Sequence, residues 1–257
     1  MSMTKLNKIC FLASSAKSAQ TSLSRFEKKF GKCPLDEADV IVALGGDGFM
    51  LQTLHQTRDM VLPVYGMNRG SAGFLMNEYQ EENLTDRLSA AEEEEINPLR
   101  MNTLDDSGVH HIELAINEVS LFRAGPQAIK LQILVDDKVR MEELVCDGAL
   151  LATPAGSTAY NYSAHGPILP IGSDVLALTA MAAFRPRRWR GALLPSSAQV
   201  EFNVLEHKKR PCRADADGKT AFNVVSVSVE SDPTIKHKIL FDPGHGLQER
   251  IIREQFY

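Results

Sequence analysis

An aspartate flanked by glycines follows a short apolar run near residue 45. The run Val40–Leu44 leads into Gly45-Gly46-Asp47-Gly48, and the helical pattern Phe49–His55 comes next. Five consecutive apolar residues are typical of a parallel strand covered on both faces, and open α/β sheets bind ligands at the carboxyl ends of such strands. Glycines there can adopt φ > 0 and expose backbone N–H groups to an anion, beside the positive end of the next helix. We interpret this turn as a phosphate cradle holding one carboxylate, because a simple helix cap needs no glycine on both sides.

A second polar stretch has a composition suited to a nucleoside. Between Thr153 and Ser163 the chain combines small hydroxyl residues, a glycine and Tyr160. Backbone amides, hydroxyls and an aromatic ring together suit a purine base and a ribose. The simplest alternative is a strand-to-helix turn in which Ser157 or Thr158 is the N-cap of a short helix.

Two acidic positions in the second half of the chain have more local interpretations. Glu118, after Asn117, falls on the apolar face of its own predicted strand. Its carboxylate must either reach solvent at the end of the strand or have a partner, and from these residues alone we expect solvent. The dipeptide Asp217-Gly218 predicts a hairpin turn, which we interpret as structural because the other ligands of a calcium loop are missing.

Two other kinds of active site find little support in the sequence. There is no GxSxG elbow, since Ser157 follows Gly156 but has no glycine after the next residue. The seven histidines show no HExxH or similar spacing. A serine hydrolase and a histidine-based metal enzyme are therefore disfavoured.

The elements that carry these residues follow two different patterns. In residues 1–97, apolar runs alternate with helical spacing, which predicts a Rossmann-like parallel α/β domain. In residues 98–238, β-branched segments with period-two alternation predict a mainly antiparallel β domain. Residues 239–257 are expected to return to the first domain, with a helix over 247–253.

Three local features refine this expectation. Pro63 suggests that the strand over 61–66 is short or at a sheet edge. A helix is predicted over Glu82–Glu95, with the run Glu92–Glu95 as its solvated end. The basic segment Arg185–Arg190 could face ATP, a neighbouring subunit or solvent. We favour a contact between subunits, because Trp189 among arginines is typical of an interface anchor.

Composition limits the partners and the compartment. At 257 residues with a net charge of −5, the chain has a large core but no general attraction to nucleic acid or anionic membrane. Four scattered cysteines without CxxC spacing favour reduced thiols in a cytoplasm. The apolar segment Ile9–Ala13 is too short for a signal peptide or a membrane span. We therefore expect a cytoplasmic protein without nucleic-acid or membrane partners.

Taken together, the motifs resemble those of the NAD kinase family. They are Gly45-Gly46-Asp47-Gly48, Asn68-Arg69-Gly70 with Gly73-Phe74-Leu75, Asn117-Glu118, and Asp147-Gly148 leading to the run Thr153–Tyr160. The first motif also resembles phosphofructokinases and the diacylglycerol and sphingosine kinases, whereas the run Thr-Pro-Ala-Gly-Ser-Thr-Ala-Tyr is highly specific. One departure is His165, at a position where the family usually has glycine.

The resemblance implies transfer of the ATP γ-phosphoryl group to the 2′-hydroxyl of the adenosine ribose of NAD, giving NADP. It implies that Asp47 contacts the accepting hydroxyl and that Gly45, Gly46 and Gly48 face the phosphates. The implied dinucleotide contacts are Phe74, Asn117, Glu118, Asp147, Ala155, Thr158, Ala159, Tyr160, Asn161, Tyr162 and Ser163.

The resemblance also implies ATP with Mg²⁺ or another divalent cation, no protein residue assigned as a metal ligand, and a homodimer or homotetramer. Two alternatives stay open at this point. A lipid kinase sharing the glycine motif would need an apolar acceptor pocket in the second domain. A non-catalytic NAD(P) sensor would bind the dinucleotide without transferring phosphate.

Overall fold

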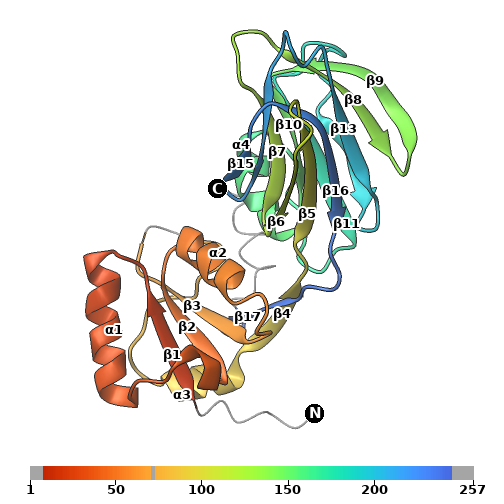
Figure 1. Ribbon diagram of the computed structural model, residues 1–257. Coiled ribbons are helices and arrows are strands. Elements are labelled where there is room, and N and C mark those ends of the chain that lie inside the picture. The colour runs from red at the N-terminus through yellow and green to blue at the C-terminus, as the bar shows by residue number, and fades with distance from the viewer. Residues whose placement is uncertain (1–7, 71–72, 245–257) are drawn as a thin grey trace. The chain divides into compact units, whose positions relative to one another are not determined.

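The computed structural model describes residues 8–70 and 73–244 (Figure 1). The chain divides into two compact units. Unit 1 combines Met1–Ile96 with Ile235–Tyr257, and unit 2 is Asn97–Thr234. The helix expected over 247–253 lies outside the described residues.

Unit 1 is a five-stranded sheet in the order β1-β2-β3-β17-β4. The first four strands are parallel, and β4 is antiparallel to β17. The elements are β1 (Ile9–Ala13), α1 (Lys17–Phe30), a 3₁₀ turn (Leu35–Glu37), β2 (Val40–Gly45), α2 (Asp47–Gln56), β3 (Pro63–Asn68), α3 (Leu84–Ala90), β4 (Glu92–Ile96) and β17 (His237–Phe241). The expected parallel α/β domain, with a returning C-terminal segment, is confirmed.

Helices cover both faces of this sheet, which explains its continuous apolar strand. Every residue of β2 is buried. Val40, Val42 and Leu44 share a core with α1 and α3, while α2 lies on the other side of the sheet (Figure 1). In that core Phe26 of α1 stacks on Phe11 of β1 with ring centroids 5.2 Å apart. Burial on both faces leaves no polar position inside the strand, so the site must lie at its end.

Two expectations for unit 1 are wrong. Pro63 does not mark an edge strand, because β3 lies between β2 and β17; proline is the first residue of the strand, where its missing N–H costs nothing. The predicted helix over Glu82–Glu95 ends at Ala90, and the glutamate run forms the edge strand β4.

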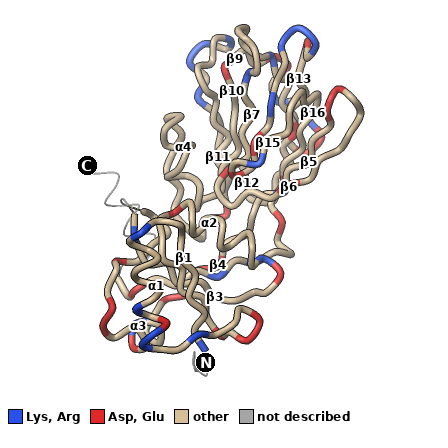
Figure 2. Tube along the Cα trace, turned by 60° about the vertical axis from the view of Figure 1, so that its left-hand side comes forward, with Lys and Arg blue, Asp and Glu red and all other residues tan. Residues whose placement is uncertain are grey.

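The edge position explains how a glutamate run can be a strand. Lys238 pairs with Glu93 at 2.9 Å and Lys236 pairs with Glu95 at 2.7 Å, and Figure 2 shows acidic and basic residues interspersed over unit 1. Charged edge strands also resist pairing with other chains.

Unit 2 consists of two six-stranded antiparallel sheets, as expected of a mainly antiparallel domain. Their orders are β12-β11-β10-β7-β14-β15 and β6-β5-β16-β13-β8-β9. The strands are β5 (Leu99–Asp105), β6 (His110–Ala115), β7 (Glu118–Arg123), β8 (Ile129–Val135), β9 (Lys138–Cys146), β10 (Gly148–Ala152), β11 (Val175–Met181), β12 (Gly191–Pro195), β13 (Val200–Leu205), β14 (Cys212–Ala216), β15 (Lys219–Ala221) and β16 (Val224–Ser231). A 3₁₀ turn (Ala155–Thr158) and the one-turn helix α4 (Tyr160–Ser163) follow β10.

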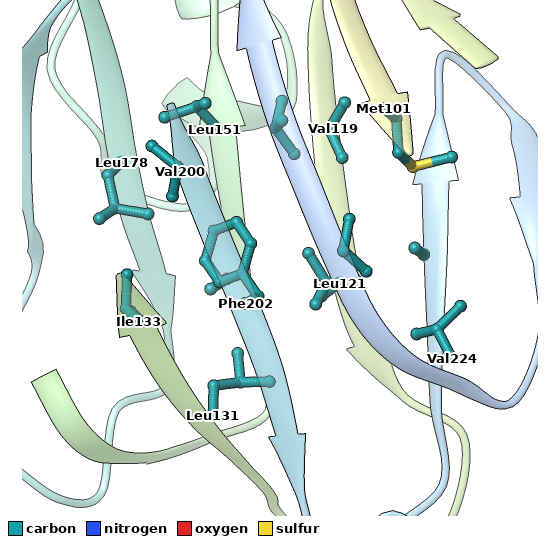
Figure 3. Close-up of a cluster of buried hydrophobic side chains, with 14 of the residues drawn as sticks. Met101, Val119, Leu121, Leu131, Ile133, Leu151, Leu178, Val200, Phe202 and Val224 are labelled. Atoms are coloured by element: carbon teal, nitrogen blue, oxygen red, sulfur yellow. The ribbon is translucent and has the colours of Figure 1, made fainter. Parts of the chain in front are cut away.

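One hydrophobic core is shared by the two sheets of unit 2. Its members come from alternating positions of both sheets, with Phe202 and Val200 from one and Leu121 and Leu151 from the other (Figure 3). Trp189 packs against this core. It is therefore a partly buried residue of its own unit, and the expectation that it anchors a subunit contact stays a prediction.

No helix within residues 8–70 and 73–244 has the length and apolarity needed to cross a bilayer. The four cysteines are free thiols, and three of them, Cys10, Cys146 and Cys212, are buried.

Replacing Phe202 by alanine should lower the free energy of unfolding by about 3–5 kcal/mol, because it leaves a cavity between the sheets of unit 2. Urea denaturation monitored by Trp189 fluorescence measures the change. Phe222→Ala is the matched control, since Phe222 is 62% exposed, and it should change the stability by no more than about 0.5 kcal/mol. Equal losses in the two variants would contradict the assigned core.

Candidate functional site

Asp47 is the first residue of α2, immediately after the carboxyl end of β2. Its carboxylate accepts hydrogen bonds from two backbone amides, Phe74 N–H at 2.7 Å on Oδ2 and Leu75 N–H at 3.0 Å on Oδ1. The position at the helix N-terminus favours the negative charge. The side chain is thus aimed by groups 27 and 28 residues further along the chain.

Close packing requires glycine at two positions near Asp47, Gly45 and Gly73, and the expectation of positive φ in the glycine turn is wrong. None of Gly45, Gly46 and Gly48 has a positive φ. A Cβ on Gly45 would lie 2.7 Å from Phe49 Cβ, and one on Gly73 would lie 2.6 Å from Asp47 Oδ1. Around Gly46 and Gly48, in contrast, a Cβ would meet no atom of the described residues within 4 Å. The backbone beside Asp47 is therefore open to a ligand.

A cavity of about 570 Å³ lies in unit 1 at the end of β3. The Arg69 guanidinium lies over the ring of Tyr79, 4.0 Å from its centroid, and Arg69 N–H donates to Gly45 O at 2.6 Å. The cavity lining is Asn68, Arg69, Gly70, Gly73, Met76, Asn77, Glu78 and Tyr79. Because Gly73 also packs on Asp47, the cavity and the carboxylate belong to one site, and Arg69 is its cation. The motif Asn68-Arg69-Gly70 contains this arginine, but the sequence alone did not predict that Arg69 is a site residue.

In unit 2, Asn117 and Glu118 stand where β7 begins, beside the end of β10. Thr153 holds the preceding backbone, because its N–H donates to Asn117 O at 3.0 Å and its Oγ1 donates to Ile116 O at 2.7 Å. Gly156 packs directly on this backbone, and a Cβ there would overlap the Asn117 carbonyl oxygen. The two predicted motifs therefore form one junction.

One oxygen of the partly buried Glu118 carboxylate is shielded from solvent, so the expectation that this carboxylate reaches solvent is wrong for that atom. Its Oε2 atom is buried and has no hydrogen-bond partner among the described residues. Burial, and then the charge of Asp217, raise the pKa of Glu118 to about 8, against the opposing hydrogen bond from the Tyr160 backbone. A carboxyl with a raised pKa in a polar site is a candidate for ligand recognition.

The stretch after β10 is held by its own side chains, and the expected N-cap role of Ser157 or Thr158 is wrong. Both residues lie within the 3₁₀ turn, and Thr153 Oγ1 accepts the Gly156 N–H at 3.0 Å. Ser157 Oγ donates to Pro154 O at 2.7 Å and accepts from Leu169 N–H at 3.0 Å.

Two residues expected to contact a dinucleotide, Asn161 and Ala155, are buried instead. Asn161 is 0% exposed, its Nδ2 donates to the Ser157 and Pro167 carbonyls, and its Oδ1 accepts from Thr179 Oγ1 at 2.6 Å. Its side chain is occupied inside the protein and supports the loop, and the expected contact of Asn161 with the dinucleotide stays a prediction. Ala155, 5% exposed, likewise offers only backbone.

Other residues of unit 2 predicted to contact the dinucleotide follow β10, and Tyr160 among them packs against the sheet that contains β7, β10 and β11. Thr158, Ala159, Tyr160, Tyr162 and Ser163 are at least partly exposed. The Tyr160 ring packs on Phe122 with centroids 5.6 Å apart, and its hydroxyl reaches Met181 Sδ at 3.1 Å.

Tyr160 thereby points along the sheet toward the far end of β10, because Gly148 pairs with both Phe122 and Met181. Asp147 precedes this end, exposed and paired with Arg123 at 2.8 Å. Unit 2 therefore presents a strip from Glu118 to Asp147 with Tyr160 along it, while Asp47 and Phe74 come together in unit 1.

His165 has a left-handed backbone, with φ of 62°. Glycine adopts this conformation without steric cost, whereas histidine does so less readily. This left-handed backbone conformation explains why the family that the motifs resemble usually has glycine at this position.

Models of two protein domains match the chain. The ATP-NAD kinase N-terminal domain matches residues 2–96, and the ATP-NAD kinase C-terminal domain matches residues 116–229. Together they span most of the sequence.

Curated relatives match over nearly the full length. The chain is 66% identical to the NAD kinase of Cereibacter sphaeroides, covering 97% of this chain and 98% of that protein. It is 54% identical to the NAD kinase of Caulobacter vibrioides, covering 98% and 96%, and 50% identical to that of Xylella fastidiosa, covering 100% and 98%.

Two solved structures share the fold. A yeast NADH kinase complexed with NADH matches with a TM-score of 0.81 and 20% identity, covering 98% of this chain and 88% of that one. An NAD kinase from Archaeoglobus fulgidus in complex with ATP matches with a TM-score of 0.74 and 22% identity, covering 96% of each chain.

Gly156→Ala should destabilise unit 2 by several kcal/mol, because the added methyl group overlaps the Asn117 carbonyl and forces the junction apart. Thermal and urea unfolding measure the loss. Gly125→Ala is the control, since a Cβ there would lie at an ordinary 3.5 Å from Pro211. A Gly156→Ala protein as stable as the control would refute the close contact.

Stability should fall as the pH rises through the range set by Glu118. A raised folded-state pKa means that folding favours the protonated acid. The contribution of Glu118 to the free energy of unfolding is therefore complete below the unfolded pKa near 4.3 and is lost as pH approaches about 8. Urea unfolding at pH 5, 7 and 9 tests this. Glu118→Gln should flatten the decline, whereas Glu142→Gln, at an exposed position of β9, should keep it. A decline that persists unchanged in Glu118→Gln would disprove the assignment.

Proposed function

The chain belongs to the NAD kinase family, and we propose how its residues share the transfer of the ATP γ-phosphoryl group to the 2′-hydroxyl of the adenosine ribose of NAD. In this proposal unit 1 supplies Asp47 and the phosphate cradle, and unit 2 supplies the contacts to NAD. The observation that carries it is the Asp47 carboxylate, fixed by the Phe74 and Leu75 amides at the end of a parallel strand.

Asp47 orients the accepting hydroxyl and receives its proton. A new bond forms between the ribose 2′-oxygen and the γ-phosphorus while the bond from that phosphorus to the β–γ bridging oxygen breaks, releasing ADP. The transition state is loose, so the proton leaves the hydroxyl late and alignment matters more than basicity. A carboxylate accepts about four hydrogen bonds, so the two amides are compatible with a further one from the sugar.

The glycine turn and the cavity at the end of β3 receive the donor phosphates. Open space around Gly46 and Gly48 lets backbone amides approach the anion, and the N-terminus of α2 favours negative charge. Arg69 gives the cavity a cation, which matters because Phe49-Met50 stands where a Walker motif would have lysine.

A divalent cation fits this site as a partner of ATP. Among the described residues there is no group of three His, Cys, Asp or Glu side chains that could hold a metal ion. Mg²⁺ is commonly bound by substrate phosphates with only one or two carboxylates, and two acids are present here, Asp47 beside the glycine turn and Glu78 in the cavity lining. The cation would neutralise charge on the phosphates.

The strip on unit 2 recognises the adenosine half of NAD. Glu118, whose buried Oε2 has no partner within the described residues, and the neighbouring Asn117 hold adenine and ribose groups. The Tyr160 ring and the exposed part of the stretch Thr158–Ser163 form a wall for the dinucleotide, with Ala155 contributing backbone and Asp147 the far end. Phe74 of unit 1 is assigned to the adenine.

The two alternative functions are less well supported. A lipid kinase needs an apolar acceptor pocket, whereas the strip on unit 2 carries Glu118, Asn117 and Asp147. The strong similarity to curated NAD kinases over 97% of the chain also favours the dinucleotide as acceptor.

We further propose that the protein works in the cytoplasm as a homodimer or homotetramer. Buried free thiols at Cys10, Cys146 and Cys212 support a reducing compartment. Exposed apolar side chains on unit 2, Phe184 at 57% and Leu193 at 56%, support contact with another copy.

Asp47→Asn should abolish nearly all NADP formation, because the amide cannot accept the proton, while circular dichroism shows a folded protein. Purified protein with ATP, Mg²⁺ and NAD is assayed for NADP. Asp59→Asn is the control, since the Asp59 side chain is 90% exposed just beyond α2, and it should keep full activity.

Calorimetry of NAD binding separates this enzyme from a sensor. Wild-type protein that binds NAD but makes no NADP would support the sensor and reject the kinase. An Asp47→Asn protein with wild-type turnover would reject the role given to that carboxylate.

A further inference from the structure

A hairpin turn in unit 2 reaches the Asn117–Glu118 pair from a distant part of the sequence. Asp217, between β14 and β15, accepts hydrogen bonds from Ile116 N–H on Oδ2 at 2.6 Å and from Asn117 N–H on Oδ1 at 3.1 Å. The sequence separation is 101 and 100 residues. Each carboxylate oxygen thus takes one of two consecutive amides.

The same backbone is held on its other side by Thr153. That residue engages the Ile116 and Asn117 carbonyls, so Asp217 takes the amides while Thr153 takes the carbonyls. With both amides and both carbonyls bonded, and Gly156 packed on Asn117, this backbone has one orientation. The direction of the Asn117 and Glu118 side chains is fixed accordingly.

The turn is built to hold its carboxylate in place. Asp217 and Gly218 both have positive φ, 47° and 89°, as in the tight turns that suit twisted hairpins. Asp215 accepts from Thr220 Oγ1 at 2.6 Å across the hairpin, and Lys219 pairs with Glu113 of β6 at 2.7 Å. A closed turn alone needs no carboxylate aimed at a distant strand, and glycine or asparagine would serve as well.

We propose that Asp217 is a positioning residue for NAD: by binding the Ile116 and Asn117 amides, it sets Asn117 and Glu118 to receive the adenosine part of the substrate. This inference rests on the proposed function, because it assigns the pair to NAD. It concerns one substrate only, since Asp217 belongs to unit 2 and the phosphate cradle belongs to unit 1.

Two substitutions remove the carboxylate without straining the turn. Asp217→Asn keeps one acceptor and tolerates positive φ, and Asp217→Gly removes the side chain at a backbone conformation that glycine adopts freely. Lys219→Met is the matched control, since it loosens the same hairpin through the Lys219–Glu113 pair and leaves the two amide bonds intact.

Steady-state kinetics with NAD and ATP varied separately should distinguish positioning from mere stability. Losing charge-assisted hydrogen bonds to consecutive amides should raise the KM for NAD about tenfold in Asp217→Asn, and further in Asp217→Gly. The KM for ATP should stay within about twofold of the wild-type value. Lys219→Met should leave both KM values unchanged.

The pH profile gives a second readout. Three groups act on Glu118 by charge or hydrogen bonding: Asp217 and Asp215 from the hairpin, and Tyr160, whose backbone donates to it. Tyr160 itself lies under the influence of Arg213. Removing the Asp217 charge favours ionised Glu118, so the pH at which the KM for NAD changes should move to lower values in Asp217→Asn.

Several outcomes would overturn the inference. A folded Asp217→Asn protein with the wild-type KM for NAD and an unmoved pH profile would show that the carboxylate only closes the hairpin. Equal increases in both KM values, or failure of both variants to fold while Lys219→Met folds, would make Asp217 a general determinant of the fold. Absence of NADP formation by the wild-type protein would instead reject the proposed function.

Discussion

The cost of removing a carboxylate from water governs the candidate residues of each unit. Asp47 meets this cost with two backbone amides and a helix N-terminus, which keep an anion fixed in unit 1. For Glu118 this cost is offset only in part, because its Oε2 is buried without a hydrogen-bond partner among the described residues and the carboxylate of Asp217 is near. In the proposed function, Asp47 orients a hydroxyl, and a bound ligand supplies the hydrogen-bond partner that Glu118 Oε2 lacks among the described residues.

Backbone groups do most of the positioning. The amides of Phe74 and Leu75 aim Asp47, and the peptides of Ile116 and Asn117 are bonded from both sides. Phosphoryl transfer through a loose transition state depends on alignment more than on strong acid–base chemistry. A scaffold of short hydrogen bonds between segments distant in sequence is suited to that demand.

The fold supplies these distant contacts through its sheets. In unit 1, parallel strands bring the turn after β2 beside the segment after β3, because both strands end at the same edge. In unit 2, β7 lies between β10 and β14, so that residues from 153 onward and residue 217 reach Asn117 from opposite sides. Each unit therefore assembles its part of the site from its central strands.

The sequence by itself determined the fold class, the parallel and antiparallel halves and the motifs, because hydrophobic period and glycine-rich turns are local signals. It misjudged Pro63 and the strand Glu92–Ile96, since strand order depends on residues far away in the chain. Only the tertiary structure decided that one oxygen of Glu118 is buried, that Asn161 is occupied internally and that Asp217 holds the Asn117 backbone. Each of these outcomes depends on hydrogen bonds or burial between segments that no local pattern joins.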